Sequence, residues 1–149
     1  MSQGTIGSFL EGREVIAAPS HLSVRDVAEL MAKHAIGAVP VLQDERLVGV
    51  FSERDLLTRV VARGLDPAST LLDQVMTRDP QTVSEEETFH GALVMMQGGR
   101  FRHLPVVRGE RVIGMISLRD VPMDVLARKH TFEAMRSRHS LDYLSPKGQ

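Results

Sequence analysis

PVLQDERLVGVFSERD, at residues 40–55, and PVVRGERVIGMISLRD, at residues 105–120, are two copies of one pattern. Eight of the sixteen positions are identical without a gap, at an offset of 65 residues. Most other differences exchange one apolar residue for another, such as Phe51 for Ile116. An internal repeat redefines the unit of folding. Two copies are too few for a solenoid, so we expect a pair of units related by a pseudo-twofold axis, each covering the other's apolar face.

The same order of elements is predicted in each copy from apolar spacing. In the first copy these are a helix ended by Gly37, two apolar strands and a second helix, at residues 24–35, 39–42, 47–51 and 52–64. In the second copy they are residues 89–97, 104–107, 112–116 and a helix from Ser117 onward, with Gly98, Gly99 and Gly109 at turns. Pro40 and Pro105 lie inside strands, which favours edge positions because proline donates no ladder hydrogen bond.

The fold class expected from this order is α/β of the α+β type, in which each unit packs a small sheet against helices. We expect a first domain at residues 5–64 with its core at 15–63, a connector at 65–76, and a second domain at 77–129. A C-terminal helix and tail would follow at 130–149. The short segment 6–10 resembles the connector segment 71–76 with a one-residue slip.

Composition excludes several classes of protein. The net charge is −1 and aromatic residues make up 4%, which argues against a nucleic-acid partner and a base-stacking surface. The chain has no cysteine, so disulfides and cysteine-based zinc sites are excluded. No apolar run approaches the ~20 residues that span a bilayer, and the N-terminal residues do not read as a secretory signal. We therefore expect a cytoplasmic protein without a membrane partner.

The repeated Ser-x-Arg-Asp sequence contains the main candidate functional residues of the chain. It occurs at residues 52–55 and 117–120, directly after the second strand of each copy. Serine followed three residues later by an acid predicts a capped helix N-terminus, which explains both residues without a ligand. Capping does not explain Arg54 and Arg119, because a cation in the first turn opposes the helix dipole. Arginine binds phosphate and a carboxylate accepts hydrogen bonds from a vicinal diol, so a ribonucleotide site is the alternative.

These motifs resemble the cystathionine β-synthase (CBS) domain over residues 5–128. The phrases IGAVPVL with GVFSERD, and FRHLPVV with GMISLRD, carry the resemblance. It implies a regulatory module without catalysis, with two clefts between its domains, that binds AMP, ADP, ATP, S-adenosylmethionine or NAD(H). In the family the aspartate holds the ribose hydroxyls. The resemblance also implies a homodimer that modulates an enzyme or transporter in trans.

Mapped onto this chain, the resemblance implies two sets of binding residues. One cleft would contain Ser52, Arg54, Asp55, Thr77, Arg102, His103 and Pro105. The other would contain Ser117, Arg119, Asp120, Ile16, Gly37, Ala38 and Pro40. We expect the first cleft to be more cationic and to hold more highly charged phosphates, and the second to leave room for adenine.

Two other functions remain open from the sequence. One is a structural dimerisation module that binds no ligand, in which the serines and aspartates serve only as helix caps. The other is an enzyme that hydrolyses or transfers a nucleotide. The six histidines show no metal-ligand spacing, so no metal site is expected, although His103 could contact phosphate or adenine.

Overall fold

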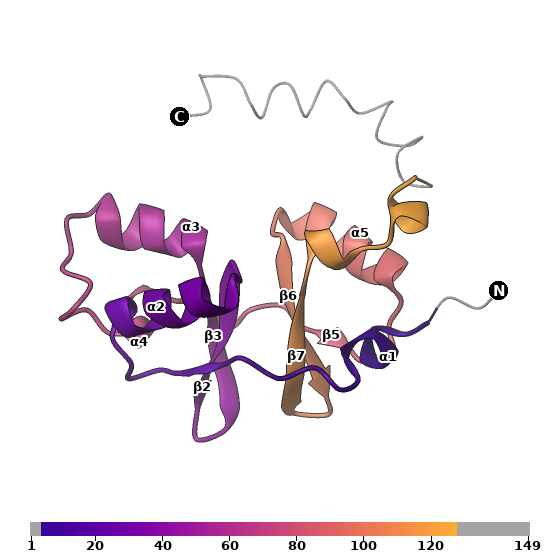
Figure 1. Cartoon of the computed structure of the whole chain (residues 1–149), viewed down its shortest axis with the longest axis horizontal. Helices are drawn as coiled ribbons and strands as arrows, with labels where there is room; N and C mark the ends of the chain where they lie inside the picture. Colours follow the sequence, from indigo (N-terminus) through magenta and orange to yellow (C-terminus); the bar gives the residue numbers. More distant parts are fainter. Residues whose placement is uncertain (1–3, 128–149) are drawn as a thin grey trace.

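The computed structural model describes residues 4–127, which form two similar halves (Figure 1). The first half contains β1 (Ala18–Pro19), α2 (Val24–His34), β2 (Ala38–Gln43), β3 (Arg46–Ser52), α3 (Glu53–Asp55), the π-helix η1 (Leu56–Val61), α4 (Leu72–Val75) and β4 (Thr77–Arg78). The second contains β5 (Val83–Ser84), α5 (Phe89–Gly99), β6 (His103–Arg108), β7 (Arg111–Ser117) and the 3-10 helix η2 (Leu118–Asp120), and α1 (Ile6–Leu10) precedes both. The α+β fold expected from the sequence is confirmed.

The repeat is reproduced in three dimensions. The helices α2 and α5, and the strand pairs β2/β6 and β3/β7, begin and end 65 residues apart. Each hairpin has its register shift at the same place, between Val41 and Leu42 and between Val106 and Val107. The repeated sequence therefore produces the same helix and hairpin in the two halves.

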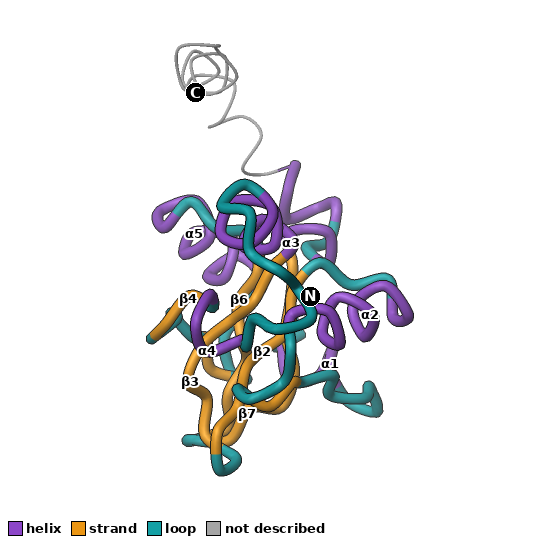
Figure 2. Tube along the Cα trace, turned by 90° about the vertical axis from the view of Figure 1, so that its left-hand side faces the viewer, coloured by secondary structure: helices purple, strands orange, loops and turns teal. Residues whose placement is uncertain are grey.

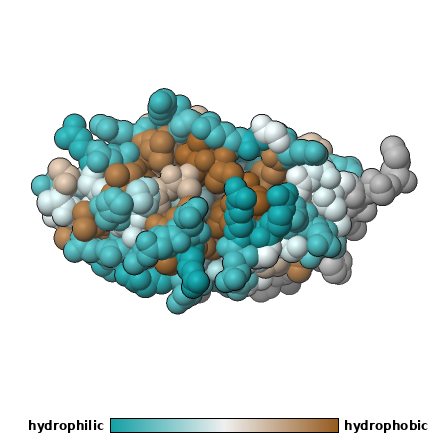
Figure 3. Space-filling view, turned by 90° about the horizontal axis from the view of Figure 1, so that it is seen from below, coloured by the Kyte–Doolittle hydropathy of each residue, from teal (hydrophilic) through white to brown (hydrophobic). Residues whose placement is uncertain are grey.

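Each half is built on an antiparallel hairpin extended by short strands. The first sheet has the order β1-β2-β3-β4 and the second β5-β6-β7. The longer helices lie toward one end of the hairpins and the hairpin turns lie at the other (Figures 1 and 2). Seen from the side of the turns, apolar side chains gather over the middle of the molecule and hydrophilic ones surround them (Figure 3).

Each core includes a short helix, and α1 packs on the half that is more distant from it in sequence. Ile6 and Leu10 of α1 lie in the core of the second half, with Leu104 and Ile116. Leu72 of α4 lies in the core of the first half. Backbone hydrogen bonds hold α1 in place, from Ile6 N to the carbonyl of Glu87 (2.9 Å) and from Gly7 N to that of Glu85 (2.8 Å). Side chains therefore pack across the domain boundaries expected from the sequence. Those boundaries remain a prediction of where each folding unit begins and ends.

Three local expectations are wrong. Helix α2 ends one residue earlier than expected, where Ala35 adopts a left-handed conformation, so Gly37 does not terminate it. Gly98 and Gly99 lie inside α5, and Arg100 takes the left-handed position instead. The helix expected from Ser117 onward is interrupted at Val121, which is extended, and helical structure resumes at residues 123–127. Pro122 explains this break, because proline disfavours the helical conformation of the residue before it.

Pro40 and Pro105 do not lie on edge strands. Strand β2 lies between β1 and β3, and β6 lies between β5 and β7. The short neighbour β1 pairs only with Val41 and Leu42, so it does not extend alongside Pro40. The corresponding pairing of β5 with β6 likewise begins after Pro105. The sequence analysis expected that each proline would not need to donate a backbone hydrogen bond to a neighbouring strand. This is so because the neighbouring strand is too short to reach the proline, and not because the proline lies on an edge strand.

The C-terminal helix and tail expected at 130–149 lie outside the described residues. Within residues 4–127, no helix has both the length and the apolar character needed to cross a membrane.

Candidate functional site

Two clefts lie where the halves meet. The Asp120 cleft has a volume of about 590 Å³ and is lined by β7, η2, the segment before β2 and residues of the N-terminal segment 9–16. The Asp55 cleft has a volume of about 950 Å³ and is lined by β3, α3, η1, residues 77–81 and residues 100–103. Each cleft thus joins the Ser-x-Arg-Asp sequence of one half to the residues before the first hairpin strand of the other.

Both clefts share one wall, formed by Glu53, Arg102 and His103. Gly37 allows these side chains to approach, since a Cβ added at Gly37 would lie 3.3 Å from both Glu53 Oε1 and His103 Nε2. In the second half, Arg102 occupies the position that Gly37 has in the first. The wall is therefore asymmetric, and its imidazole and guanidinium groups come from the second half.

Asp55 is a buried helix cap whose two oxygens both have partners. Its Oδ2 accepts hydrogen bonds from the backbone N–H (3.0 Å) and hydroxyl (3.1 Å) of Ser52. Its Oδ1 accepts one from the hydroxyl of Thr77 (3.3 Å) and lies 3.5 Å from Nε of Arg59. The side chain of Asp55 is 10% exposed. Because a carboxylate oxygen has two lone pairs, the acceptor capacity of Asp55 is used within the protein.

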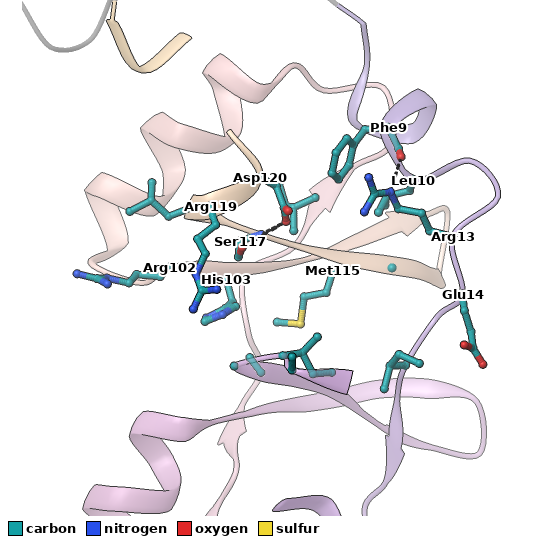
Figure 4. Close-up of a pocket in the computed structure, with 18 of the residues that line it drawn as sticks. Phe9, Leu10, Arg13, Glu14, Arg102, His103, Met115, Ser117, Arg119 and Asp120 are labelled. Atoms are coloured by element: carbon teal, nitrogen blue, oxygen red, sulfur yellow. Dashed lines mark hydrogen bonds between the residues drawn. The ribbon is translucent and has the colours of Figure 1, made fainter. Parts of the chain in front are cut away.

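Asp120 occupies the equivalent place but keeps one oxygen for the cleft. Its Oδ2 accepts from the backbone N–H (2.8 Å) and the hydroxyl (3.3 Å) of Ser117. Among the described residues, no hydrogen bond or ion pair is made to Oδ1. The residue is partly exposed and lines the cavity, with Ser117 beside it (Figure 4). A ligand diol could reach Oδ1 without breaking the cap.

Cations line both clefts. Arg102 lines the Asp120 cleft as well as the Asp55 cleft, and Arg119 lies on the same side of the Asp120 cleft as His103 (Figure 4). On the other side Arg13 stacks on Phe9, with Cζ 4.0 Å from the ring centroid, and its Nε donates to the carbonyl of Phe9 (3.1 Å). The Asp120 cleft therefore has arginines on both sides of its free carboxylate oxygen.

Burial lowers the pKa of His103 below its ordinary value of 6.5. Burial in a medium of low polarity disfavours the charged imidazolium. Glu53 and Asp120 oppose this effect because negative charge favours the proton, whereas Arg102 and Arg119 reinforce it. His103 is consequently neutral near pH 7 in the free protein, and each of its ring nitrogens can donate or accept according to its tautomer.

The titration of His103 predicts a pH dependence of stability. Its pKa is lower in the folded chain, so the unfolded chain binds the proton more readily and the free energy of unfolding falls as the pH drops below about 6.5. At pH 8 the imidazole is neutral in both the folded and the unfolded chain, so the titration of His103 does not lower the free energy of unfolding there. We expect His103→Asn to show a weaker loss than the original chain between pH 8 and 5.5, measured by urea denaturation. Parallel curves for the two chains would contradict this expectation.

The structure brings together twelve of the fourteen residues that the sequence analysis assigned to the clefts. Ser52, Arg54, Asp55 and Thr77 line the Asp55 cleft, and Ile16, Gly37, Ala38, Ser117, Arg119 and Asp120 line the other, with Arg102 and His103 in both. Pro40 and Pro105 do not line the clefts. They are buried in the hairpins, where they pair with Val50 and Met115.

The sequence analysis missed several lining residues. Arg59 follows Asp55 by four positions, a spacing that places two side chains on the same helix face and could have indicated the ion pair. Phe9 and Arg13 reach the cleft because α1 packs on the opposite half, and no local pattern signals that. Among residues 4–127, no group of three or more potential ligands among His, Cys, Asp and Glu could hold a metal ion.

Known proteins are similar to this chain over most of its length. A model of the CBS domain matches residues 10–62 and again residues 72–121. The "CBS domain-containing protein CBSCBSPB2" of Arabidopsis thaliana is 36% identical over 107 residues, which cover 71% of this chain and 20% of that protein. The chain thus spans about a fifth of the length of that curated relative.

Solved structures show the same arrangement. A protein from Burkholderia ambifaria MC40-6, described as a signal-transduction protein with CBS domains, has a TM-score of 0.76 at 30% identity, over 83% of this chain and 94% of its own. The CBS domain protein PAE2072 from Pyrobaculum aerophilum, complexed with AMP, has a TM-score of 0.74 at 28% identity, over 85% and 98%. Together with the matched repeat and the fold, these similarities establish that the chain belongs to the CBS domain family and contains two such domains in tandem.

Proposed function

We propose that this chain is a regulatory module that binds an adenine nucleotide in the Asp120 cleft. The observation that carries the proposal is Asp120, which lines a cavity between the two halves and whose Oδ1 has no hydrogen-bond or ion-pair partner among residues 4–127. A carboxylate oxygen with two unused lone pairs can accept one hydrogen bond from each of the two hydroxyl groups of a ribose. The complex of the Pyrobaculum relative with AMP supports the same class of ligand.

The rest of the cleft suits the other parts of a nucleotide. Ile16, Ile113 and Met115 provide apolar surface on which a purine ring can pack. Arg119 and the wall of Arg102 and His103 can donate hydrogen bonds to phosphate, and guanidinium groups bind phosphate with two parallel hydrogen bonds. Base, sugar and phosphate therefore each find groups of matching chemistry within one cavity.

Regulation would follow from the position of the cleft. Its lining comes from both halves, so a ligand contacts both at once and favours the arrangement in which these contacts fit best. A ligand shifts a conformational equilibrium only by its difference in affinity for the two states. We infer that the module acts on an enzyme or transporter in trans rather than by catalysis. The hydroxyl groups of Ser52 and Ser117 are engaged with the capping aspartates, which does not favour their use as nucleophiles.

A panel of ligands tests the proposal. We expect calorimetric titration to show binding of at least one of AMP, ADP, ATP, S-adenosylmethionine and NADH, and the same ligand to raise the melting temperature. A ligand at 100 times its Kd should stabilise the folded chain by about 2.7 kcal/mol. If none of the five compounds binds or stabilises the chain, the proposal is wrong.

The alternative is a structural module without a ligand, and one observation favours it. The hydrogen bonds from Ser52 to Asp55 and from Ser117 to Asp120 are those of helix caps, which need no ligand. The homodimer expected from the sequence stays a prediction that fits either function. Leu57 and Val61 of η1, which are 62% and 59% exposed, offer apolar surface for such an interface. Sedimentation with and without AMP would separate ligand-dependent from constitutive association.

A further inference from the structure

The Asp120 cleft has two ends, and the carboxylate of Asp120 lies between them (Figure 4). Arg119 and His103 lie at one end, which is where the proposed function places the phosphate group. Phe9 and Arg13 lie at the other end. A nucleotide carries its base and its phosphate on opposite sides of the ribose. A ribose held at Asp120 with its phosphate at the first end therefore directs its base toward Arg13.

Contacts with the second half hold Arg13 in position. Its Cζ lies 4.0 Å from the centroid of the Phe9 ring, and its Nε donates to the carbonyl of Phe9 (3.1 Å). The ring of Phe9 packs edge-on against that of Phe89, a core residue of the second half, with the two centroids 5.2 Å apart. Leu10 lies directly over β7, because a Cβ added at Gly114 would be 2.9 Å from its Cδ1. A guanidinium fixed in this way loses little conformational freedom when it binds a ligand.

The two terminal nitrogens of Arg13 are available to a ligand. Within residues 4–127 they take part in no hydrogen bond or ion pair, and the neighbouring Glu14, which also lines the cleft, forms no ion pair with them. An arginine side chain has hydrogen-bond donors and no acceptor. At this end of the cleft it therefore favours a ligand group that presents acceptors.

Two classes of purine differ in the groups that they present at this edge. A 6-oxopurine, such as guanine or hypoxanthine, carries two adjacent acceptors, O6 and N7, which match two parallel donors of a guanidinium. Adenine carries N7 beside an amino group, which is itself a donor. An arginine that meets this edge of the base therefore favours a 6-oxopurine relative to adenine.

We propose that Arg13 is a specificity-determining residue of the Asp120 cleft, and that it lets the cleft bind a 6-oxopurine nucleotide as well as an adenine nucleotide. The inference rests on the proposed function, from which it takes the positions of the ribose and the phosphate. It deepens that function by naming the residue that recognises the base.

AMP and IMP are the probes for the experiment, because they differ only at the edge of the base that bears position 6. We expect calorimetric titration of the full chain to show binding of both. Arg13→Met should weaken IMP binding about tenfold or more, because two parallel hydrogen bonds to the base are lost, and AMP binding by less than about threefold. Methionine keeps an unbranched side chain that can pack on Phe9, so the fold should be retained.

Arg63→Met is the matched control, since it removes the same charge from an exposed position outside both cleft linings. We expect its affinities for AMP and IMP to stay within twofold of those of the original chain. Urea denaturation of both variants shows whether each is folded. A loss of IMP affinity in the control as large as in Arg13→Met would mean that net charge, and not contact with the base, decides the result.

Three other results would overturn the inference: equal weakening of AMP and IMP by Arg13→Met, unchanged affinity for both, or a chain that binds AMP but not IMP. Equal weakening would place Arg13 at the phosphate or the sugar. All three leave AMP binding, and with it the proposed function, in place. Binding of IMP without AMP, weakened by Arg13→Met, would support the inference and refute adenine as the base. A chain that binds neither nucleotide would contradict both proposals.

Discussion

Asp120→Ala is expected to weaken AMP binding roughly a hundredfold. The substitution removes the free Oδ1 and with it two charge-assisted hydrogen bonds to the ribose diol, together worth about 3 kcal/mol. Calorimetric titration measures the loss directly. The same substitution removes a helix cap, which costs about 1 kcal/mol of folding stability, so the experiment needs a control that loses the same cap.

Asp55→Ala provides that control, because it removes the equivalent cap in the other half. We expect AMP affinity to change by less than about threefold in this variant, provided that urea denaturation shows it folded. The ligand 2′,3′-dideoxy-AMP completes a thermodynamic cycle, since Asp120→Ala should have little further effect on a ligand that lacks both hydroxyls. Near-equal loss of AMP and dideoxy-AMP binding would mean that Asp120 acts through structure and not through the diol.

Ile6→Ala is expected to lower the free energy of unfolding by about 2–4 kcal/mol. Ile6 is fully buried in the core of the second half, and truncation there leaves a cavity beside Leu104 and Ile116. Chemical denaturation in urea measures the change. Such a cost would be surprising for a residue so near the N-terminus if α1 were only a loosely attached arm.

Two comparisons make the Ile6 result specific. Leu57→Ala removes a large apolar side chain that is 62% exposed, and should change stability by no more than about 0.5 kcal/mol. Leu72→Ala, at the equivalent place in the first core, should cost about as much as Ile6→Ala. A change below about 1 kcal/mol for Ile6→Ala would contradict the packing of α1 on the second half.

Much of the fold could be predicted from the sequence because it depends on short-range pattern. The hairpin strands β2, β3, β6 and β7 and the helices α2 and α5 follow from the spacing of apolar residues, and the duplication doubles each signal. The short strands β1, β4 and β5 were not predicted. The hydrogen bonds that cap α3 and η2 join residues that are three positions apart in sequence. They could therefore be predicted from the pairs Ser52 with Asp55 and Ser117 with Asp120. Helix ends were less predictable, because Ala35 and Arg100 adopt the left-handed conformation that glycine was expected to provide.

Most residues of the candidate site could be predicted from the sequence, but the difference between its two aspartates could not. The repeat places an arginine and an aspartate in each half, and the repeated Ser-x-Arg-Asp sequence does not distinguish Asp55 from Asp120. Only the folded chain brings Thr77, 22 residues away, to Oδ1 of Asp55, the oxygen that also lies near Arg59. Arg13 reaches the Asp120 cleft because α1 packs on the second half, although the first half directly follows α1 in sequence.

The sequence alone therefore determined the duplicated unit, its strands and the two capped Ser-x-Arg-Asp corners, since these depend on neighbours along the chain. Tertiary structure alone decided which carboxylate keeps an oxygen free for a ligand, which arginines remain unpaired and which side chains form the shared wall. These properties depend on contacts between residues far apart in sequence, and such contacts are fixed only when the two halves pack together.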